Sequence, residues 1–144
     1  MADDRILKTL DGGALLRKGD GPDALVLEVP AGASLSKPVY LTNVLASEAD
    51  ADTRLDLHVE LARGSQAEVV IDDRCAVTLP FRTARNIHID VASDATLHLC
   101  TIEELCDEAQ SDVAITVANA GNVSMGTFSL MGGTSTHHVA LDFT

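Results

Sequence analysis

The feature that most constrains this chain is an alternation of apolar and polar residues that recurs along the sequence. In residues 55–62 the odd positions are Leu or Val, and the even positions are Asp, His, Glu and Ala. A similar alternation returns in residues 87–91, 95–102 and 113–118. Side chains of a β-strand point to opposite faces in turn, so a period of two predicts strands with one buried and one solvated face. No segment carries a long apolar stripe of helical period, and the chain is predicted to be nearly all β.

The alternating segments also resemble one another. Residues 57–62 read LHVELA and residues 87–92 read IHIDVA, 30 residues later, and a related unit, VAITVA, begins 26 residues after Ile87. Self-similarity at a period of about 20–50 residues is typical of solenoids. We therefore predict a right-handed parallel β-helix with stacked aliphatic side chains inside, which fits an aromatic content of 3%.

The predicted β-helix domain spans residues 24–144 and follows an N-terminal segment, residues 1–23, in which residues 6–10 form an edge strand or a helical turn. The acidic residues 103–112 are expected to be a loop or one helical turn. Six aliphatic side chains are expected to stack in the interior, namely Leu57, Val59, Ile87, Ile89, Ile115 and Val117. An antiparallel sandwich or jelly roll is the alternative. It is disfavoured because no Asn-Gly or Asp-Gly pair joins two of the strands.

The charge of the chain argues against two classes of partner. The net charge is −12, and no Lys or Arg follows Arg85. Nucleic acid and anionic membrane surfaces both require basic protein surface, so neither is expected as a partner. No apolar run approaches the roughly 20 residues of a membrane span. Three cysteines and a polar start without a secretory signal favour a reducing compartment, so a cytoplasmic location is predicted.

Two His-carboxylate pairs form the most regular candidate site. His58 and His88 are expected on the outer face of adjacent coils, with Glu60 and Asp90 in the next row. Imidazole and carboxylate groups are plausible ligands for a metal ion, and a metal would offset the repulsion between stacked carboxylates. The simpler interpretation, a solvated polar face, is favoured.

Three other sets of residues are weaker candidate sites. His98 and Cys100 share a face, with Cys106 in the acidic stretch that follows, but their spacing is not a standard zinc or iron–sulfur pattern. Cys75 follows Arg74, which is weak evidence for an activated thiolate. The adjacent His137 and His138 face opposite ways on a strand and cannot share one metal without a bulge. We find no catalytic or cofactor-binding residue, and metal binding is undetermined.

Residues 29–41, VPAGASLSKPVYL, resemble the first strands of the β-helix in the SufB/SufD family of iron–sulfur cluster assembly proteins. Residues 58–71, 95–99 and 128–133 resemble later rungs, and the likeness extends over residues 24–144. The resemblance implies a right-handed parallel β-helix that works as a scaffold with an ATPase partner, SufC. The sequence reaches Thr144 without the family's C-terminal helical region, and the rung of the sulfur-handling cysteine corresponds to residues 113–118, which lack Cys. The resemblance therefore assigns no cluster ligand.

Three functions follow from these observations. The first is a non-enzymatic SufB/SufD-like scaffold or accessory protein in iron–sulfur cluster assembly, with no resident cofactor beyond a transient cluster and with a SufC-like ATPase as a partner. The second is an interaction module without a cluster role, and the third is a small cupin-like metal-dependent enzyme. We also expect a homodimer through the C-terminal strands, because residues 139–143 are apolar on one face and contain no Lys or Pro to discourage pairing.

Overall fold

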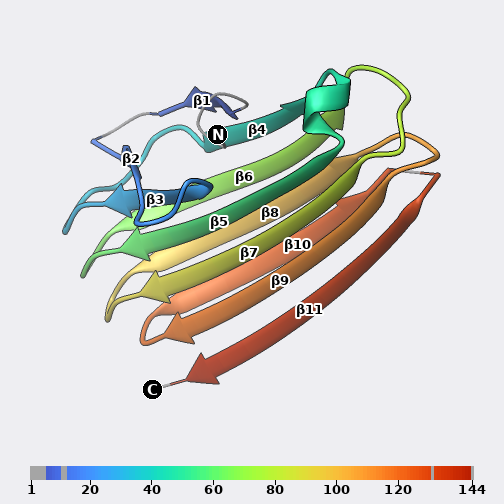
Figure 1. Ribbon diagram of the computed structural model, residues 1–144. Coiled ribbons are helices and arrows are strands. Elements are labelled where there is room, and N and C mark those ends of the chain that lie inside the picture. The colour runs from blue at the N-terminus through green and yellow to red at the C-terminus, as the bar shows by residue number, and fades with distance from the viewer. Residues whose placement is uncertain (1–5, 11–12, 131, 144) are drawn as a thin grey trace.

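The computed structural model describes residues 6–10, 13–130 and 132–143, and it is a two-sheet parallel β-solenoid (Figure 1). From β3 to β11 the chain passes from one sheet to the other at each corner, so consecutive strands lie in opposite sheets, whereas β2 and β3 lie side by side in the same sheet. In spatial order, sheet A contains β1 (Ile6–Thr9), β4 (Val39–Leu45), β6 (Gln66–Cys75), β8 (Thr96–Glu104) and β10 (Asn122–Ser129). In spatial order, sheet B contains β11 (Thr134–Phe143), β9 (Gln110–Asn119), β7 (Arg82–Val91), β5 (Asp52–Leu61), β3 (Ala24–Val29) and β2 (Leu15–Lys18).

The pairing confirms the parallel β-helix and excludes the antiparallel sandwich. From β3 to β11 every neighbouring pair within a sheet is parallel. The cupin-like alternative requires an antiparallel barrel, and the parallel pairing does not supply it. A short 3-10 helix, η1 (Glu48–Asp50), lies between β4 and β5. Within the described ranges, no helix is long and apolar enough to cross a membrane.

The repeat length between β7 and β9 differs from the one that the sequence indicated. Ile87 pairs with Ile115, 28 residues later, whereas Val113, taken as the start of the matching unit, pairs with Arg85. The error is two residues, and a shift of two keeps each side chain on its face of the strand. The predicted inner and outer faces therefore remain correct although the predicted register was wrong.

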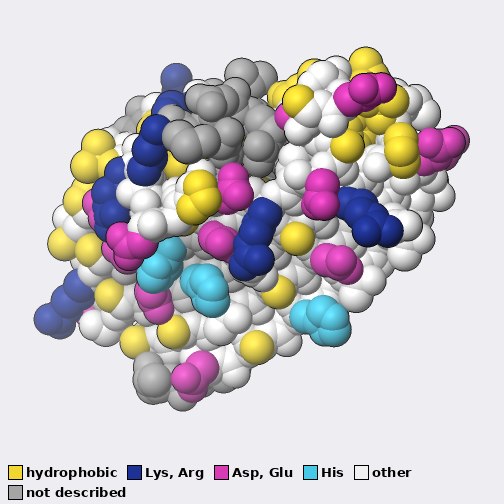
Figure 2. Space-filling model, in the orientation of Figure 1, with side chains coloured by type: hydrophobic (Ala, Val, Ile, Leu, Met, Phe, Trp, Pro, Cys, Tyr) yellow, Lys and Arg dark blue, Asp and Glu magenta, His cyan; other side chains and the backbone are white. Residues whose placement is uncertain are grey.

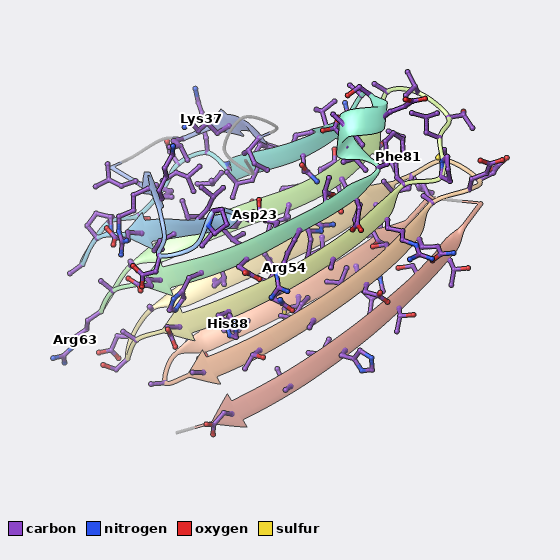
Figure 3. All side chains as sticks on the ribbon, in the orientation of Figure 1. Asp23, Lys37, Arg54, Arg63, Phe81 and His88 are labelled. Carbon is purple, nitrogen blue, oxygen red and sulfur yellow. The ribbon has the colours of Figure 1, made fainter. Side chains whose placement is uncertain are left out.

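The interior is filled by aliphatic side chains in ladders that cross the rungs. The six residues expected to stack there are each 2% exposed or less and belong to one apolar cluster. Beyond a band of polar side chains lies a second, smaller apolar cluster, formed by Leu45, Phe81, Leu105 and Ala109. Phe81 is labelled near this end of the rungs in Figure 3.

The corners that join sheet B to sheet A lie in register. Gly32, Gly64 and Asp94 each adopt a positive φ, of 71°, 71° and 59°. The amide of Gly32 donates to the carbonyl of Arg63, and the amide of Gly64 donates to the carbonyl of Ser93. Glycine, and less readily Asp, tolerates this left-handed conformation, which explains the composition of these predicted corners.

Two predicted boundaries need correction. Half of the acidic residues 103–112 are strand, because β8 continues to Glu104 and β9 begins at Gln110, and the predicted loop is confined to residues 105–109. Residues 6–9 form an edge strand rather than a helical turn, and β1 pairs antiparallel with β4. The segment 1–23 therefore contributes two strands to the sheets of the solenoid, since β2 likewise pairs antiparallel with β3.

Candidate functional site

The C-terminal rung, defined here as β10 and β11, exposes apolar side chains at ladder positions that are buried in the preceding rungs of sheet B. One inner ladder of sheet B runs from Leu27 through Val59, Ile89 and Val117 to Leu141. Leu27 is 0% exposed and Leu141 is 54% exposed. In the next ladder Val139 is 50% exposed. The inner face of the last rung is therefore an open apolar surface.

A hollow lies where this rung leaves the interior uncovered. It has a volume of about 160 Å³ and is lined by Val117, Asn119, Val123, Met125 and Leu141. In Figure 1, β11 lies at the edge of sheet B, and its described pairing is with β9. The rung thus combines an apolar inner surface with a strand edge.

The opposite end of the solenoid is covered. β1 lies against β4 and β2 lies against β3, so both edges of the first rung are paired. Ile6 and Ala14 are buried in the main apolar cluster, and Leu10 and Leu16 pack against it. The N-terminal strands β1 and β2 therefore cover the first rung of the solenoid.

A belt of polar side chains crosses the interior, and sequence analysis missed it. On sheet A the inner ladder Asn43, Asp73, Glu103 and Ser129 runs across four strands. Arg85 projects inward from sheet B and is 2% exposed. Its Nη2 lies 2.5 Å from Oδ2 of Asp73, and Asn43 Nδ2 donates to Oδ1 of Asp73 at 2.9 Å. The buried carboxylate is thus held by a buried guanidinium and an amide.

Glu103 forms the second half of the belt and ties the last rung to the rest of the protein. It is 0% exposed and accepts hydrogen bonds from Ser111 at 2.5 Å, Ser129 at 2.7 Å and Ser135 at 2.7 Å. His137 Nε2 lies 3.1 Å from its Oε2. Burial alone would raise the pKa of Glu103, but these hydrogen bonds outweigh burial and hold the pKa below its usual value.

Asp72 is a buried carboxylate on the other face of β6. Its pKa is raised to about 6, chiefly by burial and then by the nearby charge of Glu104, although Arg74 opposes the rise. Nη2 of Arg74 lies 2.9 Å from Oδ2 of Asp72 and 2.9 Å from Oε2 of Glu104. Asp72, Arg74 and Glu104 thus form a structural ion-pair group on the face of sheet A opposite the belt.

The outer face of sheet B carries the predicted His-carboxylate site. His58 pairs with His88 and Glu60 pairs with Asp90, as the sequence predicted. The structure brings donor atoms of His58, Glu60 and Asp90 within 4.8 Å of one another. His88 lies beside them, with its ring centroid 6.2 Å from that of His58. Figure 2 shows His side chains next to acidic ones on this face, and Figure 3 places His88 on β7.

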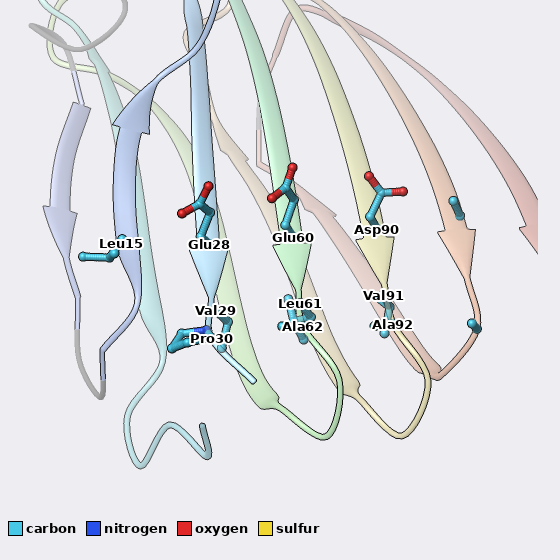
Figure 4. A pocket seen from close by; sticks show the side chains of 12 residues that line it. Leu15, Glu28, Val29, Pro30, Glu60, Leu61, Ala62, Asp90, Val91 and Ala92 are labelled. Carbon is cyan, nitrogen blue, oxygen red and sulfur yellow. The ribbon is translucent and has the colours of Figure 1, made fainter. Parts of the chain in front are cut away.

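A groove adjoins these residues at the ends of β3, β5 and β7. Its volume is about 570 Å³. Glu28, Glu60 and Asp90 stand in a row across the three strands along one side of it, and Leu15 of β2 lies at one end (Figure 4). Ala62, Ala92, Ala118 and Ala120 also line the groove. Acidic and apolar surfaces therefore meet there.

The cysteines are arranged differently from the sequence-based grouping. His98 and Cys100 do share the outer face of β8, where His98 Nδ1 lies 2.5 Å from the hydroxyl of Ser124. Cys106, however, lies beside Cys75, and its amide donates to Cys75 Sγ at 3.4 Å. Burial raises the pKa of Cys75 to about 11, although the hydrogen bond from the Cys106 amide opposes the rise, so Arg74 does not activate this thiol.

The adjacent histidines point to opposite faces, as predicted. His137 turns inward to Glu103, whereas His138 is exposed.

The sequence did contain a signal for the polar belt, because Asn43, Asp73 and Glu103 follow one another at intervals of 30 residues. Asp73 also has the inward parity of Val69 and Ile71. The parity was the signal that could have identified the belt.

Comparison with family models, with curated proteins and with solved structures found no match for this chain.

Proposed function

We propose that this chain is a non-enzymatic scaffold that associates with a second copy of itself through its C-terminal rung. The observation that carries the proposal is the exposure of Leu141 and Val139 at positions whose ladder neighbours are buried. Apolar side chains and free strand edges at the end of a solenoid favour association with another such end.

A two-fold axis perpendicular to both sheets supplies a suitable geometry. It would pair β11 with β11 and β10 with β10 of the second copy, each antiparallel, and would continue both sheets across the interface. Leu141 and Val139 would then be covered by the partner's equivalent residues. The outer strand edge of β11 contains no Lys or Pro to oppose this pairing.

Charge opposes the association and makes it sensitive to salt. Residues 86–144 contain eight Asp or Glu and no Lys or Arg. Two such ends repel at low ionic strength, and added salt screens that repulsion. The dimer is therefore expected to strengthen as the salt concentration rises.

Iron–sulfur cluster assembly is the biological context that we propose for the scaffold. The support is the resemblance of residues 24–144 to the SufB/SufD family, together with three free cysteines, which suit a reducing cytoplasm. A SufC-like ATPase is the proposed partner. The protein is expected to purify without stoichiometric iron, since the resemblance assigns no cluster ligand to this chain.

Light scattering on three proteins tests the association. The wild type should have twice the chain mass of 15.1 kDa at micromolar concentration. Leu141→Asp places a charge on the open inner face and should give monomer. Ala140→Asp places the same charge one residue away on the outer face of β11 and should remain dimeric. A monomeric wild type at every salt concentration, or equal effects of the two variants, would contradict the proposal.

Anaerobic reconstitution with iron and sulfide separates the scaffold with a cluster role from a simple interaction module. A cluster that forms only when a SufC-like ATPase is present would support the assembly role. A stable coloured species on this chain alone, lost when Cys75, Cys100 and Cys106 are changed to Ser, would contradict the expectation of no resident cluster. Binding of the ATPase with no cluster under any condition would favour the interaction module.

A further inference from the structure

We propose that His58, Glu60 and Asp90 form a binding site for a divalent transition-metal ion, with Zn²⁺ as the best fit. This site lies on the outer face of sheet B and is independent of the proposed association. His58 and Glu60 are two residues apart on β5, so both side chains point outward. Asp90 is the register partner of Glu60 on β7 and joins them from the next strand.

The donor groups already lie close together. Nδ1 of His58 lies 3.7 Å from Oε1 of Glu60, while Nε2 of the same ring contacts Oδ2 of Asp90, so the two carboxylates meet different nitrogens of the ring. With one ligand atom taken from each residue, the three atoms lie within 4.8 Å of one another, and an ion would bind one ring nitrogen while the farther carboxylate turns toward it. A tetrahedral zinc site with bonds of about 2.0–2.2 Å needs donor separations of roughly 3.4 Å. The three side chains are 38–54% exposed, so rotamer changes can close the remaining gap.

The charges in this row favour a cation. Glu28, Glu60 and Asp90 occupy one outer row on three adjacent strands, and like charges placed opposite each other destabilise a sheet. Arg17 Nε lies 2.8 Å from Glu28 and offsets the first of them. Glu60 and Asp90 share His58, whose ring offers a nitrogen ligand. A divalent ion on these three groups would balance both carboxylates.

The donor types select the class of metal. One imidazole nitrogen with two carboxylate oxygens suits Zn²⁺, whereas Mg²⁺ and Ca²⁺ prefer oxygen ligands throughout. Three protein ligands leave a fourth position open, and Glu60 and Asp90 both line the groove of about 570 Å³. Water or a small ligand can reach the ion from that side (Figure 4). His88, with its ring 6.2 Å from that of His58, is the nearest additional imidazole described.

Titration calorimetry of the full chain with ZnCl₂ tests the site. The wild type should bind one ion, and His58→Ala, Glu60→Gln and Asp90→Asn should each weaken binding by at least about tenfold, which corresponds to 1.4 kcal/mol. His98→Ala is the matched control, because His98 is an exposed histidine on the outer face of sheet A. Circular dichroism confirms that each variant is folded.

The cysteines are the competing explanation for any zinc that binds. A Cys75→Ser, Cys106→Ser variant should therefore keep the wild-type affinity, and Co²⁺ bound to the wild type should show no thiolate charge-transfer band. Loss of binding in the cysteine variant, unchanged binding in His58→Ala, or no binding to the wild type would each overturn the proposal.

Discussion

The two ends of the solenoid differ in how their inner apolar side chains are covered, although the same inner ladder reaches both ends. Leu27 and Leu141 occupy the same ladder, four rungs apart in register, and both are leucines. β2 and β1 cover the first rung, and Leu27 is 0% exposed, whereas Leu141 is 54% exposed. In a solenoid each rung contacts its neighbours, so burial depends on a rung being present on both sides. The same residue in the same ladder therefore stabilises the fold at one end and presents a surface at the other.

The largest expected effect comes from placing a charge at the covered end. Leu27→Asp should cost at least about 4 kcal/mol and prevent folding, because the carboxylate is buried without a partner. Ile89→Asp in the middle of the ladder should do the same. Leu141→Asp should change the stability of the monomer by no more than about 0.5 kcal/mol. Urea unfolding measured at low protein concentration provides the comparison, and similar losses for Leu27→Asp and Leu141→Asp would show that the ends do not differ.

The next effect concerns the buried ion pair between the two ends. Removing one partner, in Asp73→Leu or Arg85→Met, should cost about 3–5 kcal/mol, because the other charge remains buried. The double variant Asp73→Leu, Arg85→Met should be less destabilised than either single variant. Unfolding free energies of the three variants form a double-mutant cycle. Additive losses would show that the two groups do not interact as their 2.5 Å contact indicates.

A pH effect should distinguish the ends further. The folded-state pKa of Glu103 is lowered, so its stabilising contribution is complete above the unfolded pKa of about 4.3 and is lost as the pH falls through the folded value. Ser129, Ser135 and His137 of the last rung all depend on this carboxylate. Acid should therefore loosen β10 and β11 before β3. Hydrogen exchange of the wild type, corrected for intrinsic rates, should show this order, and Glu103→Gln should show it at neutral pH.

Equal loss of protection in β3 and β11 on acidification would contradict the role given to Glu103. It would mean that the belt does not hold the last rung preferentially.

The smallest effect is expected on the outer face. His88→Ala removes an exposed side chain whose described ring contact is with His58. The unfolding free energy should change by less than about 1 kcal/mol. A loss comparable with that of Ile89→Asp, its neighbour on the opposite face of β7, would contradict the assignment of inner and outer faces.

Much of this structure was predictable from the alternation, because a period of two fixes which side chains share a face. The difference between the two ends was not, since Leu141 and Leu27 have the same local pattern and only the neighbouring rungs distinguish them. The burial of Asp73 and Glu103 was not predicted, since Asp73 was assigned no role and Glu103 was placed in an acidic loop or helical turn, and carboxylates are rarely buried. Their partners Arg85, Ser129 and Ser135 come from other strands, so the belt depends on register. The proximity of Cys75 and Cys106 could not be predicted either, because it depends on how the loops after β6 and β8 are placed.

Hydrogen exchange of β11 at two protein concentrations tests the central claim most directly. If two copies pair through this strand, amides of β11 on the edge away from β9 should be protected at high concentration and exchange freely on dilution. Leu141→Asp should abolish that dependence and Ala140→Asp should retain it. Amides of β11 that exchange at the same rate at every concentration would contradict association through the C-terminal rung.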